Sequence, residues 1–312
     1  MTAPRAAPEP FLVRQIRYKA FRQHWNIGVI HADAATVAGL NGLEAQDRAL
    51  RSTNWMPELT GRFLADPFPR VHTDGSVEIL CEDLTWNVGR GEIAVVPYRE
   101  GRFGRPAPLL RTPFHLSYPF IYEHAEPATF FPEHSAAGDL SIYHAPPDGT
   151  ARRLRTIFNG LPVIDPTFLW HAGEHWLFCT HPGAGENRDL HIYRAATIDG
   201  PWHPHSANPV KRDFMGARPA GQFIEHAGAT YRVGQDCVDS YGRGIIVFRV
   251  VELGADRYVE ERVAEIYPPA SSPYPYGLHT LASAGAICTI DGARPDQRFP
   301  LANALLGRFL RA

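Results

Sequence analysis

Cysteine is scarce in this chain of 312 residues, which has four, and no two of them lie close together in sequence. Zinc ribbons and thiol redox sites need cysteines paired at short spacing, so the sequence indicates neither class of site. We expect four reduced thiols in the core of a cytoplasmic protein, namely Cys81, Cys179, Cys237 and Cys288.

The chain also lacks an excess of charge and long apolar runs. It has 31 basic and 33 acidic side chains, which gives no basic surface for a nucleic-acid partner. No run of about 18 apolar residues occurs, so we expect no membrane span. The segment Met1–Pro10 is rich in alanine and proline and has no apolar core of the kind that a secretory signal needs. With nucleic acid and a membrane span not indicated, we expect the partner to be a small neutral or mildly charged ligand.

Glycine and proline are abundant, at 27 and 28 residues, and aromatic residues make up 11%. This composition favours many short strands separated by tight turns. The clearest unit starts within Leu161–Phe168, where Asp165 and the following proline open an apolar strand. The chain then turns at Gly173, returns through Trp176–Phe178, and forms a third strand at Asp189–Tyr193.

Similar openings recur along the chain, separated by 52, 47, 53 and 61 residues, close to the size of a four-stranded blade. The phrase Asp-Leu-x-Ile-Tyr also returns after 50 residues, at 139–143 and 189–193. We predict an all-β fold, a five-bladed β-propeller. A two-sheet sandwich would not explain the repeat. The five openings lie at Asp66, Tyr118, Asp165, Arg218 and His279.

The apolar strand at about 25–30 stands alone near the N-terminus, while the last unit, Gly277–Ile290, is short of strands. We predict that the N-terminal strand joins the last blade and closes the ring, because its backbone groups need partners. The expected organisation is a mobile leader at 1–24, one propeller domain at 25–293, and a tail at 294–312 that forms a short helix. The segment 34–52 is compatible with a helix or a loop.

In a propeller the first strand of each blade lines the central channel, so the five opening residues should meet at one mouth. The ends of the second strands add further polar side chains. So many polar groups in a place where burial is costly indicate a ligand site. The added candidates are Glu82, Glu133, His181, Gln235 and Asp236.

Two of the openings, Ala65–Phe68 and Ile164–Thr167, resemble the blade openings of five-bladed glycosidases of the arabinanase, levansucrase and invertase superfamily, which includes glycoside hydrolase family 43. Five motifs are more similar to the propeller at the N-terminus of glucosamine inositolphosphorylceramide transferases, a module that also occurs in bacterial proteins. The likeness covers about residues 25–290. These motifs are Trp25–Gly28, Phe63–Phe68, Ser117–Phe120, Ala217–Gly221 and Gly277–Thr280.

The resemblance to the glycosidases implies inverting hydrolysis, with Asp66 as general base and Asp165 as the carboxylate that orients substrate. Such chemistry needs acid and base about 6.5–9.5 Å apart. The family pattern places the acid, a glutamate, at the start of the fourth blade, where this chain has Arg218. Arginine does not release its proton near neutral pH, so Glu133 is our candidate acid. Glu82 and Asp236 are the alternatives.

Arg218 also favours a second hypothesis, glycosyl transfer from a phosphate-activated sugar, because guanidinium binds phosphate through two parallel hydrogen bonds. His181 and His279 would assist it. A purely structural role, neutralising Asp66 and Asp165, is equally compatible with the sequence. A third hypothesis is a non-catalytic sugar-binding propeller that serves a partner glycosyltransferase.

Fifteen histidines raise the question of a metal. His115, His134, His181 and His279 could converge, but their separations show no ligand spacing such as HxxxH. We therefore predict no metal and no cofactor, with a single cation on the channel axis as the alternative. Two tryptophans in loops beside the first blade are candidates for stacking on a sugar face, Trp55 and Trp86.

Overall fold

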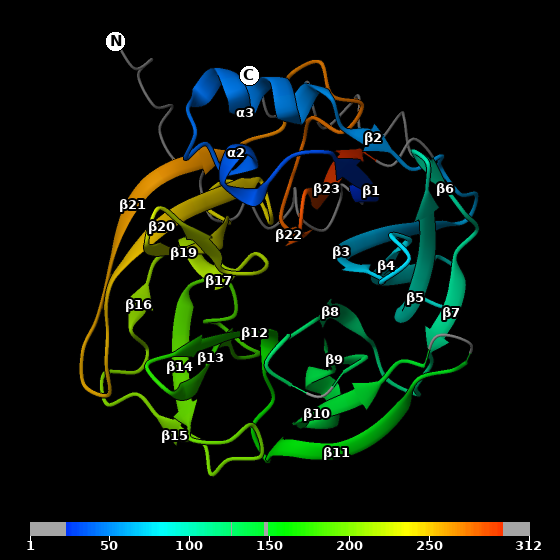
Figure 1. The fold of residues 1–312 in the computed structure, drawn as a ribbon. Coiled ribbons are helices and arrows are strands. Elements are labelled where there is room, and N and C mark those ends of the chain that lie inside the picture. The colour runs from blue at the N-terminus through cyan, green and yellow to red at the C-terminus, as the bar shows by residue number, and fades with distance from the viewer. Residues whose placement is uncertain (1–22, 126, 147–148, 296–312) are drawn as a thin grey trace, which may run out of the picture.

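Five antiparallel sheets stand around a central axis in the computed structural model, which describes residues 23–125, 127–146 and 149–295 (Figure 1). Each sheet has four or five strands, and the innermost strand of each faces the axis. The prediction of a five-bladed β-propeller is confirmed.

The first four blades follow one another along the chain, each running outward from its inner strand. The first contains β3 (Arg62–Val71), β4 (Val77–Thr85), β5 (Arg90–Arg99), β6 (Arg102–Phe103) and β7 (Ala107–Leu110). The second contains β8 (Ser117–Phe120), β9 (Thr129–Glu133), β10 (Asp139–His144) and β11 (Arg152–Asn159), with the 3-10 turn η1 (Ser135–Ala137). The third contains β12 (Ile164–His171), β13 (Glu174–Thr180), β14 (Asp189–Ala195), β15 (His203–Pro204) and β16 (Lys211–Arg212). The fourth contains β17 (Met215–Pro219), β18 (Ile224–His226), β19 (Ala229–Asp236), β20 (Gly244–Leu253) and β21 (Tyr258–Ile266).

The last blade combines both ends of the described chain, in the order β2 (Asn54–Trp55), β1 (Gln23–Ile30), β23 (Ile287–Pro295) and β22 (Leu281–Ala284). β1 pairs with β23 along its whole length, from Gln23 opposite Pro295 to Ile30 opposite Cys288. The predicted closure by the N-terminal strand is confirmed. Residues 23 and 24, assigned to the leader, begin β1, and residues 294 and 295, assigned to the tail, end β23. The rest of the expected leader and tail lies outside the described residues.

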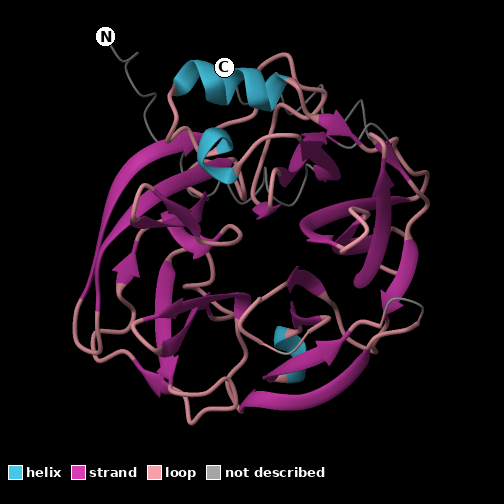
Figure 2. Cartoon of the chain, in the orientation of Figure 1, coloured by secondary structure: helices cyan, strands magenta, loops and turns pink. Residues whose placement is uncertain are grey.

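The segment that the sequence left open forms two helices, α2 (Ala34–Val37) and α3 (Leu43–Arg51), which lie together at the edge of the ring (Figure 2). Asp33 caps α2 by accepting the Thr36 amide at 2.8 Å. The apolar sides of both helices pack on residues of the last two blades. None of the described helices has the length and apolar character needed to cross a membrane.

Three inner strands bend at the same place, immediately before a proline. Asp66, Tyr118 and Asp165 are left-handed there, with φ of 52°, 44° and 49°, and the pairing register shifts at each. Residues with a side chain adopt this conformation only where other contacts stabilise it, so each bulge indicates local strain. In the fourth blade Gly216 takes the left-handed position, at φ 85°, and Arg218 does not.

All four cysteines are buried, and none forms a disulfide. Burial raises the pKa of the Cys237 thiol to about 11, which keeps it protonated near neutral pH. The expectation of reduced core thiols agrees with this arrangement.

Candidate functional site

The strained bulges are held by carboxylates from the preceding blade. Asp291 of the last blade accepts the Asp66 amide at 3.1 Å. Asp66 in turn accepts the Tyr118 amide of the second blade at 3.2 Å. Glu133, at the end of β9, accepts the Asp165 amide of the third blade at 3.2 Å. Each left-handed residue therefore donates its amide across a seam, and we refer to Asp291, Asp66 and Glu133 as the seam carboxylates.

The seam between the third and fourth blades is bridged by side chains instead. Arg218 donates to Asp165 through Nε at 2.6 Å and Nη2 at 3.4 Å, and through Nη1 to Asn187 at 3.0 Å. Gln235 adds a hydrogen bond to Asp165 at 2.9 Å. The Asp165 side chain is buried, at 3% exposed, and the Arg218 side chain is 12% exposed. The geometry thus pairs Arg218 with Asp165, which is half of the structural alternative, whereas Asp66 contacts Tyr118, Thr280 and His279.

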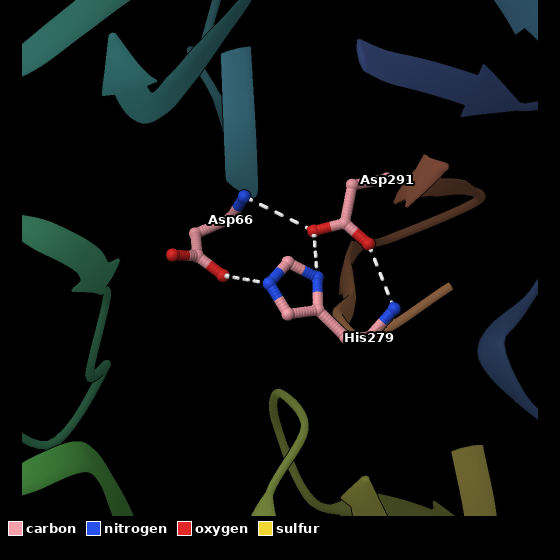
Figure 3. A group of neighbouring side chains, drawn as sticks. All are labelled: Asp66, His279 and Asp291. Carbon is pink, nitrogen blue, oxygen red and sulfur yellow. Dashed lines mark hydrogen bonds and ion pairs between the residues drawn. The ribbon is translucent and has the colours of Figure 1, made fainter. Parts of the chain in front are cut away.

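His279 lies between two carboxylates (Figure 3). Its Nδ1 is 2.6 Å from Asp291 Oδ2, and its Nε2 is 3.6 Å from Asp66 Oδ1. Burial opposes a charged imidazolium, but the Asp291 and Asp66 carboxylates outweigh it and raise the pKa of His279. Thr280 donates its hydroxyl to the same Asp66 oxygen at 2.8 Å.

Asp66, His279 and Asp291 are also the described residues that lie close enough together to hold a metal ion. The two oxygens of Asp291 already face four N–H groups, from the amides of Asp66, His279 and Thr280 and from the His279 ring. Since those donors occupy the oxygens that an ion would need, hydrogen bonding accounts for the cluster. The expectation of no metal stays a prediction.

The carboxyl groups of the mouth differ in their affinity for protons. Burial raises the pKa of Asp66 to about 6, against the lowering effect of His279. Burial, with the neighbouring charge of Asp165, raises the pKa of Glu133 to about 8. Burial and the nearby charge of Asp66 raise the pKa of Glu82 well above its ordinary value. Near neutral pH the mouth therefore combines a mostly ionised Asp66 with a mostly neutral Glu133.

Tyr118 is fully buried, and its hydroxyl is engaged by the protein. The hydroxyl lies 2.8 Å from Thr167 Oγ1 and accepts the Gly221 amide at 2.7 Å. Gly221 itself lies against β22, where an added Cβ would meet the Leu281 carbonyl at 1.8 Å. The Tyr118 hydroxyl thus links the second, third and fourth blades.

Two other predicted residues have their polar atoms used close to their own strands. Both ring nitrogens of His181 are occupied, one by the Pro162 carbonyl at 2.7 Å and one by the Tyr193 hydroxyl at 2.9 Å. Asp236 accepts the Tyr267 hydroxyl at 2.7 Å. The contacts of His181 therefore stabilise the third blade, and that of Asp236 stabilises the fourth.

Sequence reasoning missed Asp291, which contacts both Asp66 and His279. The sequence contains an indication of its role, because Asp291 is the one charged residue in the otherwise uncharged stretch 287–293. It also missed Tyr241, whose ring lies 5.0 Å from the Arg218 guanidinium and 5.2 Å from His279. Of the two tryptophans proposed to stack on sugar, Trp55 packs on Tyr274, at 4.6 Å between rings. Trp86 packs on Phe63 at 5.3 Å.

A family model described as glucosamine inositolphosphorylceramide transferase 1, N-terminal, matches residues 53–269. Among curated proteins, glucosamine inositolphosphorylceramide transferase 1 of Arabidopsis thaliana is 32% identical over 66% of this chain, and that of Oryza sativa subsp. japonica is 30% identical over 64%. The matched region is 28% of the Arabidopsis protein and 27% of the rice protein, so the chain spans less than a third of either.

Solved structures share the fold at low sequence identity. An exo-β-1,3-galactanase from Clostridium thermocellum has a TM-score of 0.50 and 12% identity, over 70% of this chain and 54% of that one. A family 117 glycoside hydrolase from Zobellia galactanivorans has a TM-score of 0.48 and 11% identity, over 87% and 91%.

Proposed function

The chain belongs to the glucosamine inositolphosphorylceramide transferase 1 N-terminal family. We propose that its channel mouth binds a carbohydrate and hydrolyses a glycosidic bond. The fold is that of a carbohydrate-related propeller, and the inner-strand residues Asp66, Asp165 and Arg218 lie at the seams of its ring. The reaction assigned to it is inverting hydrolysis.

One observation carries this proposal: two buried carboxyl groups lie at the start of β8, where Asp66 accepts the Tyr118 amide and Glu133 lies opposite the preceding residue, Ser117. In keeping with two different roles, burial raises the pKa of Asp66 to about 6 and that of Glu133 to about 8. A general base must be ionised and a general acid protonated at the working pH, and environments that separate two carboxyl groups in this way identify the pair. Asp66 removes a proton from a water molecule as the water oxygen attacks the anomeric carbon from the face opposite the leaving group. Glu133 gives its proton to the departing oxygen as the glycosidic bond breaks. This single displacement inverts the configuration of the anomeric carbon.

Asp165 supports this chemistry as a fixed charge. Its carboxylate receives hydrogen bonds from Arg218 and Gln235, and its amide donates to Glu133. The negative charge of Asp165 raises the pKa of Glu133. An aspartate held in this way helps to keep the neighbouring acid protonated.

Glycosyl transfer is the second candidate, and Arg218 is the observation that favours it. Three of its five N–H groups donate to Asp165 and Asn187, which leaves two for a phosphate on the donor sugar. The curated relatives are also named transferases, although this chain matches less than a third of their length. Binding of a sugar nucleotide, lost in Arg218→Lys, would support transfer over hydrolysis.

The experiment for hydrolysis compares the wild type with Asp66→Asn on a panel of aryl glycosides and oligosaccharides. We expect turnover by the wild type and none by the variant, since asparagine keeps the hydrogen-bond acceptor for the Tyr118 amide but cannot take a proton. Circular dichroism checks that the variant is folded. The matched control is Asp74→Asn, in the exposed turn after β3. Equal activity of Asp66→Asn and wild type would overturn the assignment, and glycan binding without product would identify a non-catalytic binding propeller.

A further inference from the structure

The proposed base must stay ionised although it is buried. The Asp66 side chain is 8% exposed, and burial, followed by the charges of Asp165 and Asp291, raises its pKa to about 6. The titratable groups of the adjacent strands are acidic as well. They are Glu82 on β4, which lies opposite the residue before Asp66, and Tyr118 on β8. A positive charge in contact with Asp66 is therefore needed to offset these groups.

His279 is placed to supply that charge. Its Nε2 lies 3.6 Å from Asp66 Oδ1, and its Nδ1 lies 2.6 Å from Asp291 Oδ2 (Figure 3). An ionised carboxylate accepts hydrogen bonds and donates none, so both ring nitrogens face acceptors when the two aspartates are ionised. Only the imidazolium form carries a proton on each nitrogen and satisfies both contacts.

Two aromatic rings fix the plane of the imidazole. Trp25 stacks on His279, with 4.0 Å between the ring centroids and 26° between the planes. Tyr241 meets the imidazole edge to face, at 5.2 Å. The face of a tryptophan ring attracts a cation, so the stacking both orients His279 and favours its charged form.

Asp291 holds His279 from the other side. Its side chain is 0% exposed, and it accepts the backbone amides of His279 and Thr280 at 2.9 and 3.1 Å in addition to facing the ring. In Ser-His-Asp triads a buried aspartate orients the histidine and stabilises the imidazolium. Asp291 has the same relation to His279, with Asp66 in the place of the group on which the histidine acts.

The contacts of Asp66 also determine which of its oxygens is free. Oδ1 accepts the Thr280 hydroxyl at 2.8 Å and faces His279, while Oδ2 accepts the Tyr118 amide at 3.2 Å. A carboxylate has about four lone pairs, two on each oxygen. These three partners use three of them, and the fourth is on Oδ2.

We propose that His279 and Asp291 are positioning residues for the proposed base, which keep Asp66 in its charged form and leave its Oδ2 to take the proton of water. This inference rests on the proposed hydrolysis. Asp291 acts through His279, and His279 acts on Asp66. The proton from water goes to Asp66 Oδ2, and the protons on the His279 ring stay where they are.

The first test needs no activity. Nitrogen-15 NMR follows the two ring nitrogens of His279 as the pH is raised. We expect both to be protonated up to a midpoint above the ordinary value of 6.5, and we expect Asp291→Asn to lower that midpoint because the imidazolium loses a neighbouring negative charge. A wild-type midpoint at or below 6.5 would overturn the proposal without any variant, and so would a midpoint that Asp291→Asn leaves in place.

The second test is His279→Gln, which removes the charge and keeps a polar side chain. The titration midpoint of Asp66 should rise by about one pH unit or more, since an opposite charge at this distance acts on that scale. Carboxyl carbon NMR measures the midpoint. The acid limb of kcat/KM, measured on the aryl glycoside that the wild type hydrolyses best, should move to higher pH by the same amount.

The matched control is His203→Gln, on the exposed strand β15, which should move neither the midpoint nor the acid limb. If His279→Gln lowers kcat/KM by the same factor at every pH, the role of His279 is structural and the proposal fails. An unchanged Asp66 midpoint would also overturn it, whatever the enzyme assay shows. A raised midpoint in a protein that cleaves no glycoside would support the contact and would count against the proposed hydrolysis alone.

Discussion

Arg218 and Asp165 form a buried ion pair across the seam between the third and fourth blades, with Nε of the arginine 2.6 Å from one carboxylate oxygen. The fourth blade therefore places a fixed cation where the glycosidase pattern has a proton donor. This pairing stabilises the charge of Asp165, and in the proposed hydrolysis the acid is another carboxyl group, that of Glu133. It also makes the seam sensitive to loss of either partner.

Replacing Arg218 with alanine should destabilise the fold by roughly 3–5 kcal/mol, because a buried carboxylate loses its countercharge. Urea unfolding measures this free energy. The double variant Arg218→Ala with Asp165→Asn should recover part of the loss, since the neutral amide is less costly to bury alone. Two single effects that simply add would contradict the coupling.

Glu133→Gln should change how stability depends on pH. The folded pKa of Glu133, about 8, lies above its ordinary value of 4.5, so the folded state holds a proton that the unfolded state releases. The wild type therefore gains stability from this group at low pH and loses it as pH rises from 4.5 through 8. Relative to the wild type, the variant should become more stable across that window, as seen in melting temperatures at pH 5 and 8.5. Glu44→Gln, exposed on α3, is the control, and a constant difference at both pH values would argue against the shift.

Tyr118→Phe should lower the free energy of unfolding by about 1–3 kcal/mol, because the buried Gly221 amide loses its hydrogen-bond acceptor. Thr167 loses a partner in the same variant. The free energy of unfolding measures the effect against Tyr276→Phe, whose side chain is 52% exposed. A loss no larger than in that control would show that the hydroxyl does not hold the blades together.

The sequence predicted the architecture because a blade is a local unit. The strands and turns of one blade lie within about fifty consecutive residues, so successive blades can be aligned with one another in the sequence. The closure by β1 followed from counting, since the last unit had too few strands and an apolar strand at 25–30 had no partner. The mouth residues Asp66, Asp165 and Arg218 followed from their equivalent positions in the repeat.

The contacts that define the site were not predictable in this way, because they join distant parts of the chain. Asp291 accepts a hydrogen bond from the amide of Asp66, which lies 225 residues away in the sequence. The two residues do not occupy equivalent positions in the repeat. The preference of Arg218 for Asp165 over Asp66 depends on where two seams lie in space. The left-handed bulges depend on the same contacts, since proline alone does not impose them.

The seam carboxylates also bear on how relatives of this protein should be read. Asp66 and Glu133 each accept an amide from the next blade, so a descendant that stopped acting on sugars would still need them to keep its ring closed. Selection for folding alone is enough to retain them. Their presence in another sequence therefore indicates that the ring is kept, and does not by itself indicate catalytic ability.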